Sequence, residues 1–139
     1  MSFPANLDYL CAKRAAALTA ALTDPQAKVK VKNPLNHVQK SMGILQEDGL
    51  YAFGVYQKYK DKEGGATLGI LFKEFLTRDP PKPILFPAGA PAAGDLTSVI
   101  KELTGQSLAQ IFLARDLILR VLVYAYYHLR ANEKKPEQD

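Results

Sequence analysis

The residues best suited to binding chemistry in this sequence are lysines gathered in one quarter of the chain. Residues 28–62 hold seven lysines against three acidic residues, whereas basic and acidic side chains balance on either side of this segment. The whole net charge of +4 therefore comes from this segment. Such a cluster fits a surface that faces a polyanion. For a surplus this modest, a solvated face without a partner is the starting expectation. The seven residues are Lys28, Lys30, Lys32, Lys40, Lys58, Lys60 and Lys62.

The spacing of these lysines gives two kinds of surface. In the stretch AKVKVKNP, lysine alternates with valine, so an extended chain places Lys28, Lys30 and Lys32 on one side. Lys58, Lys60 and Lys62 lie near the end of an expected helix, where the helix dipole also favours cations. For these three, a structural role competes with a binding role.

Three tyrosines, Tyr51, Tyr56 and Tyr59, interleave with the lysines. Aromatic side chains among cations can stack on single-stranded bases. Tyrosines at helical spacing are more often core residues with a solvated hydroxyl. We favour the core for Tyr56 and leave both interpretations open for Tyr51 and Tyr59.

Catalytic and metal-binding chemistry have little support in the sequence. The chain holds two histidines, His37 and His128, and one cysteine, Cys11, which is few ligands for a transition-metal site. Neither a GxSxG nor an HExxH motif is present. We expect no metal, no cofactor and no small-molecule substrate. An enzyme ranks below both a nucleic-acid-binding subunit and a protein–protein adaptor.

The elements that must position the lysines are predicted to be helices. Asparagine, aspartate and serine stand where N-caps are expected, at Asn6, Asn33, Asp95 and Ser107. Gly49 is expected to end the second helix in the left-handed conformation. Apolar residues recur at intervals of three and four between these signals. The predicted helices span residues 7–22, 34 to about 46 (ended by the break at 47–49), 50–62, 67–76, 96–104 and 107–131.

The last predicted helix, residues 107–131, is the most distinctive. No Pro or Gly interrupts it, and at 25 residues it is about 37 Å long. Its middle is apolar apart from Arg120, so we expect burial on nearly every side. Arg115, Asp116 and Arg120 argue against a membrane span, and a strand rarely exceeds about 10 residues. The sequence therefore predicts a single compact all-α domain of about six helices around a long C-terminal central helix.

The segment 78–94 carries five prolines and is predicted to be a loop without a regular helix. Its apolar triplet, Ile84-Leu85-Phe86, has two interpretations. It either pins the loop to the surface of its own domain, which we slightly favour, or docks another protein. The polar C-terminal stretch, residues 132–139, is predicted to be a flexible tail.

The length of 139 residues predicts one domain. The cysteine content predicts a reducing compartment. A lone cysteine excludes an internal disulfide, which favours the cytoplasm. The N-terminal stretch MSFPANLDYL lacks the basic-then-apolar layout of a signal peptide. We therefore expect a cytoplasmic protein without membrane association.

Two stretches resemble a known family. Residues 35–53, LNHVQKSMGILQEDGLYAF, resemble the small helical subunit of the Cmr (type III-B) CRISPR effector complex, in which a short helix leads through a Gly-Leu break to an Ala-Phe-rich helix. Residues 95–131 are similar to its short Asp-Leu helix and long terminal helix. The run Lys13-Arg14-Ala15-Ala16 matches a basic-Ala start of its first helix.

The resemblance implies a non-catalytic subunit that stacks along an antiviral ribonucleoprotein complex. Its partners would be other subunits of the complex, copies of itself and the guide–target RNA, which it contacts through backbone phosphates. Tyr124 stands where the family commonly has a tryptophan, and the basic pair expected after it is absent. We therefore assign RNA binding to the lysine-rich segment. The alternative is a helical protein–protein adaptor that uses loop 78–94. The candidate phosphate-binding residues are Lys28, Lys30, Lys32, Lys40, Lys58, Lys60 and, less directly, Arg14.

Overall fold

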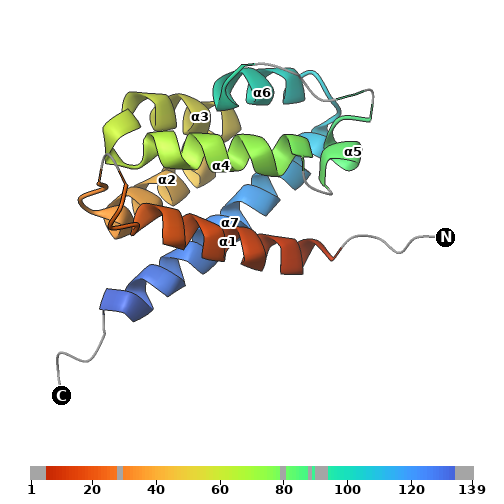
Figure 1. Ribbon diagram of the computed structural model, residues 1–139. Helices are drawn as coiled ribbons and strands as arrows, with labels where there is room; N and C mark the ends of the chain where they lie inside the picture. Colours follow the sequence, from red (N-terminus) through yellow and green to blue (C-terminus); the bar gives the residue numbers. More distant parts are fainter. Residues whose placement is uncertain (1–5, 28–29, 79–80, 88, 90–93, 134–139) are drawn as a thin grey trace.

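The computed structural model describes residues 6–27, 30–78, 81–87, 89 and 94–133. Within these ranges the chain forms seven α-helices, one short 3₁₀ helix (η1) and no strand, which confirms the predicted all-α fold (Figure 1). The elements are α1 (Leu7–Leu22), α2 (Pro34–Asp48), α3 (Leu50–Tyr59), η1 (Asp61–Glu63), α4 (Gly65–Arg78), α5 (Pro81–Leu85), α6 (Leu96–Leu103) and α7 (Leu108–Glu133).

Side-chain caps begin three of these helices as predicted. The Oδ1 atoms of Asn6, Asn33 and Asp95 accept the backbone N–H three residues later, at 3.0, 3.2 and 3.0 Å. Each bond satisfies a donor that the first turn of a helix leaves without an intrahelical partner. Pro34 occupies the first helical position of α2, where a missing N–H costs nothing.

The start of α7 differs in detail from a serine cap. Oε1 of Gln110 accepts both the backbone N–H and the hydroxyl of Ser107, each at 2.9 Å. The glutamine side chain therefore reaches back to the residue before the helix, which is one half of a capping box. Its Nε2 also donates to the carbonyl of Ile84 at 3.1 Å, which ties the start of α7 to α5.

Two helices organise the packing. The long helix α7 crosses behind α1 and α2 and contacts α1, α2 and α5 (Figure 1). Helix α4 lies among the others and contacts α1, α3, α5 and α6. Its buried face is formed by Leu68, Leu71, Phe72, Phe75 and Leu76. The core is therefore shared between α4 and α7.

The prediction that the long helix is buried on nearly every side is wrong. Its inner face is buried through Leu117, Ile118, Val121 and neighbouring residues. Leu108, Phe112 and Tyr127 are 68%, 59% and 65% exposed on the other side. The predicted tail begins too early, because Asn132 and Glu133 still belong to α7; residues 134–139 lie outside the described chain. Across the described ranges, no helix is both long and apolar enough to cross a membrane.

Several helix boundaries, and the conformation of Gly49, differ from the prediction. Helix α3 ends at Tyr59 instead of residue 62, and η1 takes up the next turn. Helix α4 begins at Gly65 instead of residue 67. Gly49 has the expected positive φ of 98°, but its ψ of −178° lies outside the left-handed helical region. Gly49 ends α2 and begins α3 at once, so its carbonyl must already point along α3.

The proline-rich segment holds a short helix, although its sequence predicts none. Pro81 and Pro83 both lie in the first turn of α5, where the backbone N–H groups have no intrahelical acceptor in any case. Leu85 and Phe86 are 0% and 3% exposed. The apolar triplet therefore pins this segment to its own domain through two of its three residues, while Ile84 stays 45% exposed.

Candidate nucleic-acid interface

A pocket of about 460 Å³ lies where the start of α2 meets the end of α3 and η1. We call it the lysine pocket. Five of its lining residues are lysines and one is glutamate, a surplus that equals the net charge of the whole chain. The lining residues are Lys30, Lys32, Asn33, Asn36, His37, Lys40, Tyr56, Lys60, Lys62 and Glu63.

The lysines meet because the chain reverses at Gly49. Helix α2 runs to this residue and α3 leaves it, so the start of α2 faces the end of α3. The contact between His37 and Gln57 spans twenty residues of sequence and marks this closure. Lysines from before α2, from α2 itself and from beyond α3 therefore surround one space.

A polar network supports the floor of the lysine pocket. Nε2 of His37 lies 2.7 Å from Oε1 of Gln57, and Nε2 of Gln57 donates to Oγ of Ser41 at 2.9 Å. All three side chains are buried. The ring of Tyr56 stacks on His37 with centroids 5.5 Å apart and planes 13° from parallel. These contacts hold both rings in place.

His37 contributes no charge to the pocket near neutral pH. Burial lowers the pKa of its imidazole below the usual 6.5, against smaller opposing effects from Gln57 and Glu63. Because the amide oxygen of Gln57 can only accept, the neutral ring carries its hydrogen on Nε2. The positive charge of the lysine pocket therefore belongs to its lysines.

Most of these lysines are not engaged by carboxylates. Lys60 lies 3.5 Å from Glu63, and its ammonium lies 5.1 Å from the ring centroid of Tyr59. Lys30, Lys32, Lys40 and Lys62 make no ion pair within the part of the chain that the structure describes. A lysine ammonium is a point charge with three donors and binds phosphate oxygens in that form.

The structure brings four predicted lysines together and separates two other candidates. Lys30, Lys32, Lys40 and Lys60 line the lysine pocket. Lys58 lies in a different groove, between α3, α4 and α6, with its ammonium 3.2 Å from the carboxylate of Asp95. We therefore remove Lys58 from the candidate interface.

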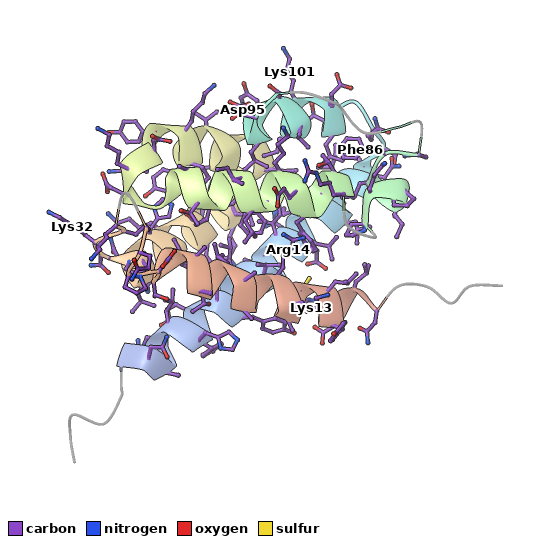
Figure 2. All side chains as sticks on the ribbon, viewed as in Figure 1. Lys13, Arg14, Lys32, Phe86, Asp95 and Lys101 are labelled. Carbon is purple, nitrogen blue, oxygen red and sulfur yellow. The ribbon has the colours of Figure 1, made fainter. Side chains whose placement is uncertain are left out.

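Arg14 belongs to another part of the molecule. Its guanidinium lies 4.0 Å from Glu74 and 5.7 Å from the ring centroid of Phe75, on the side where α1 packs against α4. Figure 2 shows Lys32 projecting from the edge of the molecule, well away from Arg14. Arg14 therefore supports helix packing. Lys28 lies outside the described residues.

Sequence reasoning missed several lining residues. It places Lys62 in the basic segment but not among the phosphate contacts, and it gives Asn36 and His37 no role. Tyr56 is expected in the core, but it is half-buried in the pocket wall. Tyr51 and Tyr59 are 49% and 77% exposed and do not line this pocket. The sequence feature that could have identified Asn36 and His37 as lining residues was their position near the predicted start of α2.

A comparison with models of known protein families, with curated proteins and with solved structures finds no match. Among the described residues, no group of three or more His, Cys, Asp and Glu side chains lies close enough together to hold a metal ion. The arrangement of charge and shape in the lysine pocket therefore carries the functional argument.

Proposed function

We propose that this protein is a cytoplasmic, non-catalytic small subunit of a type III CRISPR ribonucleoprotein effector complex. In this proposal it stacks along the complex and contacts the guide–target RNA through backbone phosphates. The convergence of five lysines on one pocket supports the RNA contact. The resemblance of residues 35–53 and 95–131 to the Cmr small subunit supports the choice of complex.

The distribution of charge favours a polyanion over a neutral partner. Charges outside the lysine pocket cancel in the sequence as a whole, whereas the pocket concentrates the surplus. Four of its lysines have no carboxylate to displace in the described chain. Binding a phosphate therefore gains electrostatic energy and releases counterions from the RNA.

The test is the salt dependence of RNA binding by two matched triple variants. One replaces Lys30, Lys32 and Lys62 with glutamine, and the other makes the same replacement at three exposed lysines outside the pocket, Lys13, Lys82 and Lys101. Both lose three positive charges. We expect the first variant to reduce the magnitude of the slope of log K against log salt concentration by about 2 for single-stranded RNA. Each phosphate contact contributes about 0.7 to this slope. The second should leave it nearly unchanged.

Equal slopes for the two variants would contradict the assignment of the contacts to the lysine pocket. Undetectable RNA binding at low salt, with the partner subunits assembled, would contradict the proposed function itself. Stacking supplies many contacts in parallel, so the assembled state is the relevant one.

The adaptor hypothesis receives less support from the structure. Its docking plug was the triplet Ile84-Leu85-Phe86, and two of these side chains are buried within the domain. Within this triplet, Ile84 is the side chain that stays accessible to a partner, at 45% exposed. If the adaptor hypothesis held, Ile84→Asp would abolish partner capture while the triple lysine variant would not.

A further inference from the structure

A second, smaller pocket adjoins the lysine pocket. It measures about 310 Å³ and shares three lining residues with it, Lys40, Tyr56 and Lys60. We call it the apolar pocket, because its lining surface is mainly carbon. Its remaining lining residues are Gly43, Ile44, Glu47 and Asp48. The two pockets therefore lie side by side, and these three residues line both.

The two parts differ in chemistry. The lysine pocket presents cations, whereas the apolar pocket presents Ile44, the side of Tyr56 and the stems of shared lysines. Carboxylates stand at its far end, on Glu47 and Asp48. These lie in the last turn of α2, where the helix dipole disfavours negative charge. Helix stability therefore does not explain them.

Gly43 supports a ligand role for the apolar pocket. It lies in the middle of α2, where glycine is less stable than alanine. No heavy atom lies within 4 Å of the position where its Cβ would be, so packing within the protein does not require a glycine. Gly43 is one of the residues that line the apolar pocket, so the absence of a side chain at this position leaves space beside the pocket.

We propose that the two pockets together bind a single nucleotide unit. The phosphate would occupy the lysine pocket, and the base of an unpaired nucleotide would occupy the apolar pocket against Tyr56. Amino or hydroxyl groups of the nucleoside would donate to Glu47 or Asp48. The proposal rests on the proposed function and extends it, because a continuous backbone requires cations but no apolar pocket beside them. The stacking of Tyr56 on His37 holds the aromatic wall in place before the ligand arrives.

The test compares a single-stranded adenosine RNA hexamer with an abasic ribose-phosphate hexamer of equal charge. Base stacking on aromatic side chains supplies sequence-tolerant affinity, so we expect the RNA to bind about tenfold more tightly. The variant Gly43→Leu should abolish this difference and leave the affinity for the abasic hexamer unchanged. Gly69→Leu is the matched control, since Gly69 also lies inside a helix and has no heavy atom within 4 Å of the place a Cβ would take. It should retain the tenfold difference.

Equal affinity for the two hexamers would overturn the nucleotide site, and so would a difference that survives Gly43→Leu. Either result leaves the proposed function standing, because binding through the lysines would persist. If the unaltered protein in its assembled complex bound neither hexamer, the proposed function itself would be overturned. AMP distinguishes the source of the ligand. If the protein binds AMP and Gly43→Leu removes this binding, the result supports the site and shows that it also accepts free nucleotides. If the protein binds the RNA hexamer but not AMP, the site accepts a nucleotide only within a strand.

Discussion

His37 brings a titratable imidazole to a pocket lined by lysines. Its ring is buried, stacked on Tyr56 and bonded to Gln57. Burial lowers the pKa of His37, and the nearby charge of Lys60 acts in the same direction. A protonated ring would lose its hydration and add a cation beside existing cations. The folded protein therefore holds this histidine neutral where an unfolded chain would begin to protonate it.

The pH dependence of stability follows from this shift. Below the usual pKa of 6.5, the unfolded state binds more protons at this position than the folded state. The free energy of unfolding should therefore fall as the pH falls from 6.5 toward 5. Well above pH 6.5, where the histidine is neutral in both states, this contribution should be constant. Urea denaturation at several pH values measures it.

The control is His37→Gln, which keeps a polar group for Gln57 but does not titrate. Asp95, whose pKa is lowered chiefly by the backbone N–H of Ser98, affects stability only in more acidic solution. The window from pH 5 to 6.5 therefore isolates the histidine. If the variant and the original protein lost stability in parallel across this window, the assignment to His37 would be wrong.

The junction between α3 and α4 depends on two consecutive glycines. Gly64 has a φ of 117°, which L side chains rarely adopt. A Cβ on Gly65 would lie 1.8 Å from the carbonyl oxygen of Gln57 and 2.7 Å from that of Lys60. These are backbone atoms and have little freedom to move. The pair lets α4 begin directly against the end of α3 and places η1 at the lysine pocket.

Replacing Gly65 with alanine should therefore destabilise the protein by about 2 kcal/mol or more, because the backbone must shift to relieve the overlap. Gly69→Ala provides the matched control in the same helix. No atom lies within 4 Å of its Cβ position, so that change should be neutral or stabilise by up to about 1 kcal/mol. Denaturant unfolding compares the two. Equal free energies of unfolding for the two variants would show that the junction tolerates a side chain.

Helix α5 is anchored by burial. Leu85 is fully buried, whereas Ile84 beside it is 45% exposed. Leu85→Ala should cost about 2–5 kcal/mol, the range for deleting a buried leucine side chain. Ile84→Ala should cost less than about 1 kcal/mol, since less apolar surface returns to water. A similar loss of stability in both variants, measured by chemical denaturation, would contradict the packing described for α5.

Local signals predicted most of the helices. Asn6, Asn33 and Asp95 gave correct starts because N-caps act within three residues along the chain. The short helix α5 was missed because prolines were treated as helix breakers, although its first turn tolerates them. The exposed side of α7 was missed because apolar content alone does not show how many neighbours a helix has. That number depends on how α4 and α7 divide the core.

The charge pattern predicted a basic surface on the molecule but not which residues form it. Lys58 lies in the last turn of α3, whereas Lys60 follows Tyr59, the last residue of that helix. One therefore reaches Asp95 while the other lines the lysine pocket. Arg14 was included from the resemblance and from its position off the apolar stripe of the first predicted helix, neither of which reports its contact with Glu74. Closure of α2 against α3, a tertiary event, gathers the remaining lysines.

We propose that RNA binds this protein at the lysine pocket. Amide chemical shifts of the ¹⁵N-labelled protein, recorded during titration with a single-stranded RNA hexamer at low salt, test it most directly. We expect the largest changes at Lys30, Lys32, Lys40 and Lys62, around the lysine pocket. Exposed lysines elsewhere, Lys13 on α1 and Lys101 on α6, should change little (Figure 2). Changes centred on Lys13 or Lys101 would contradict the claim, and so would an unchanged spectrum.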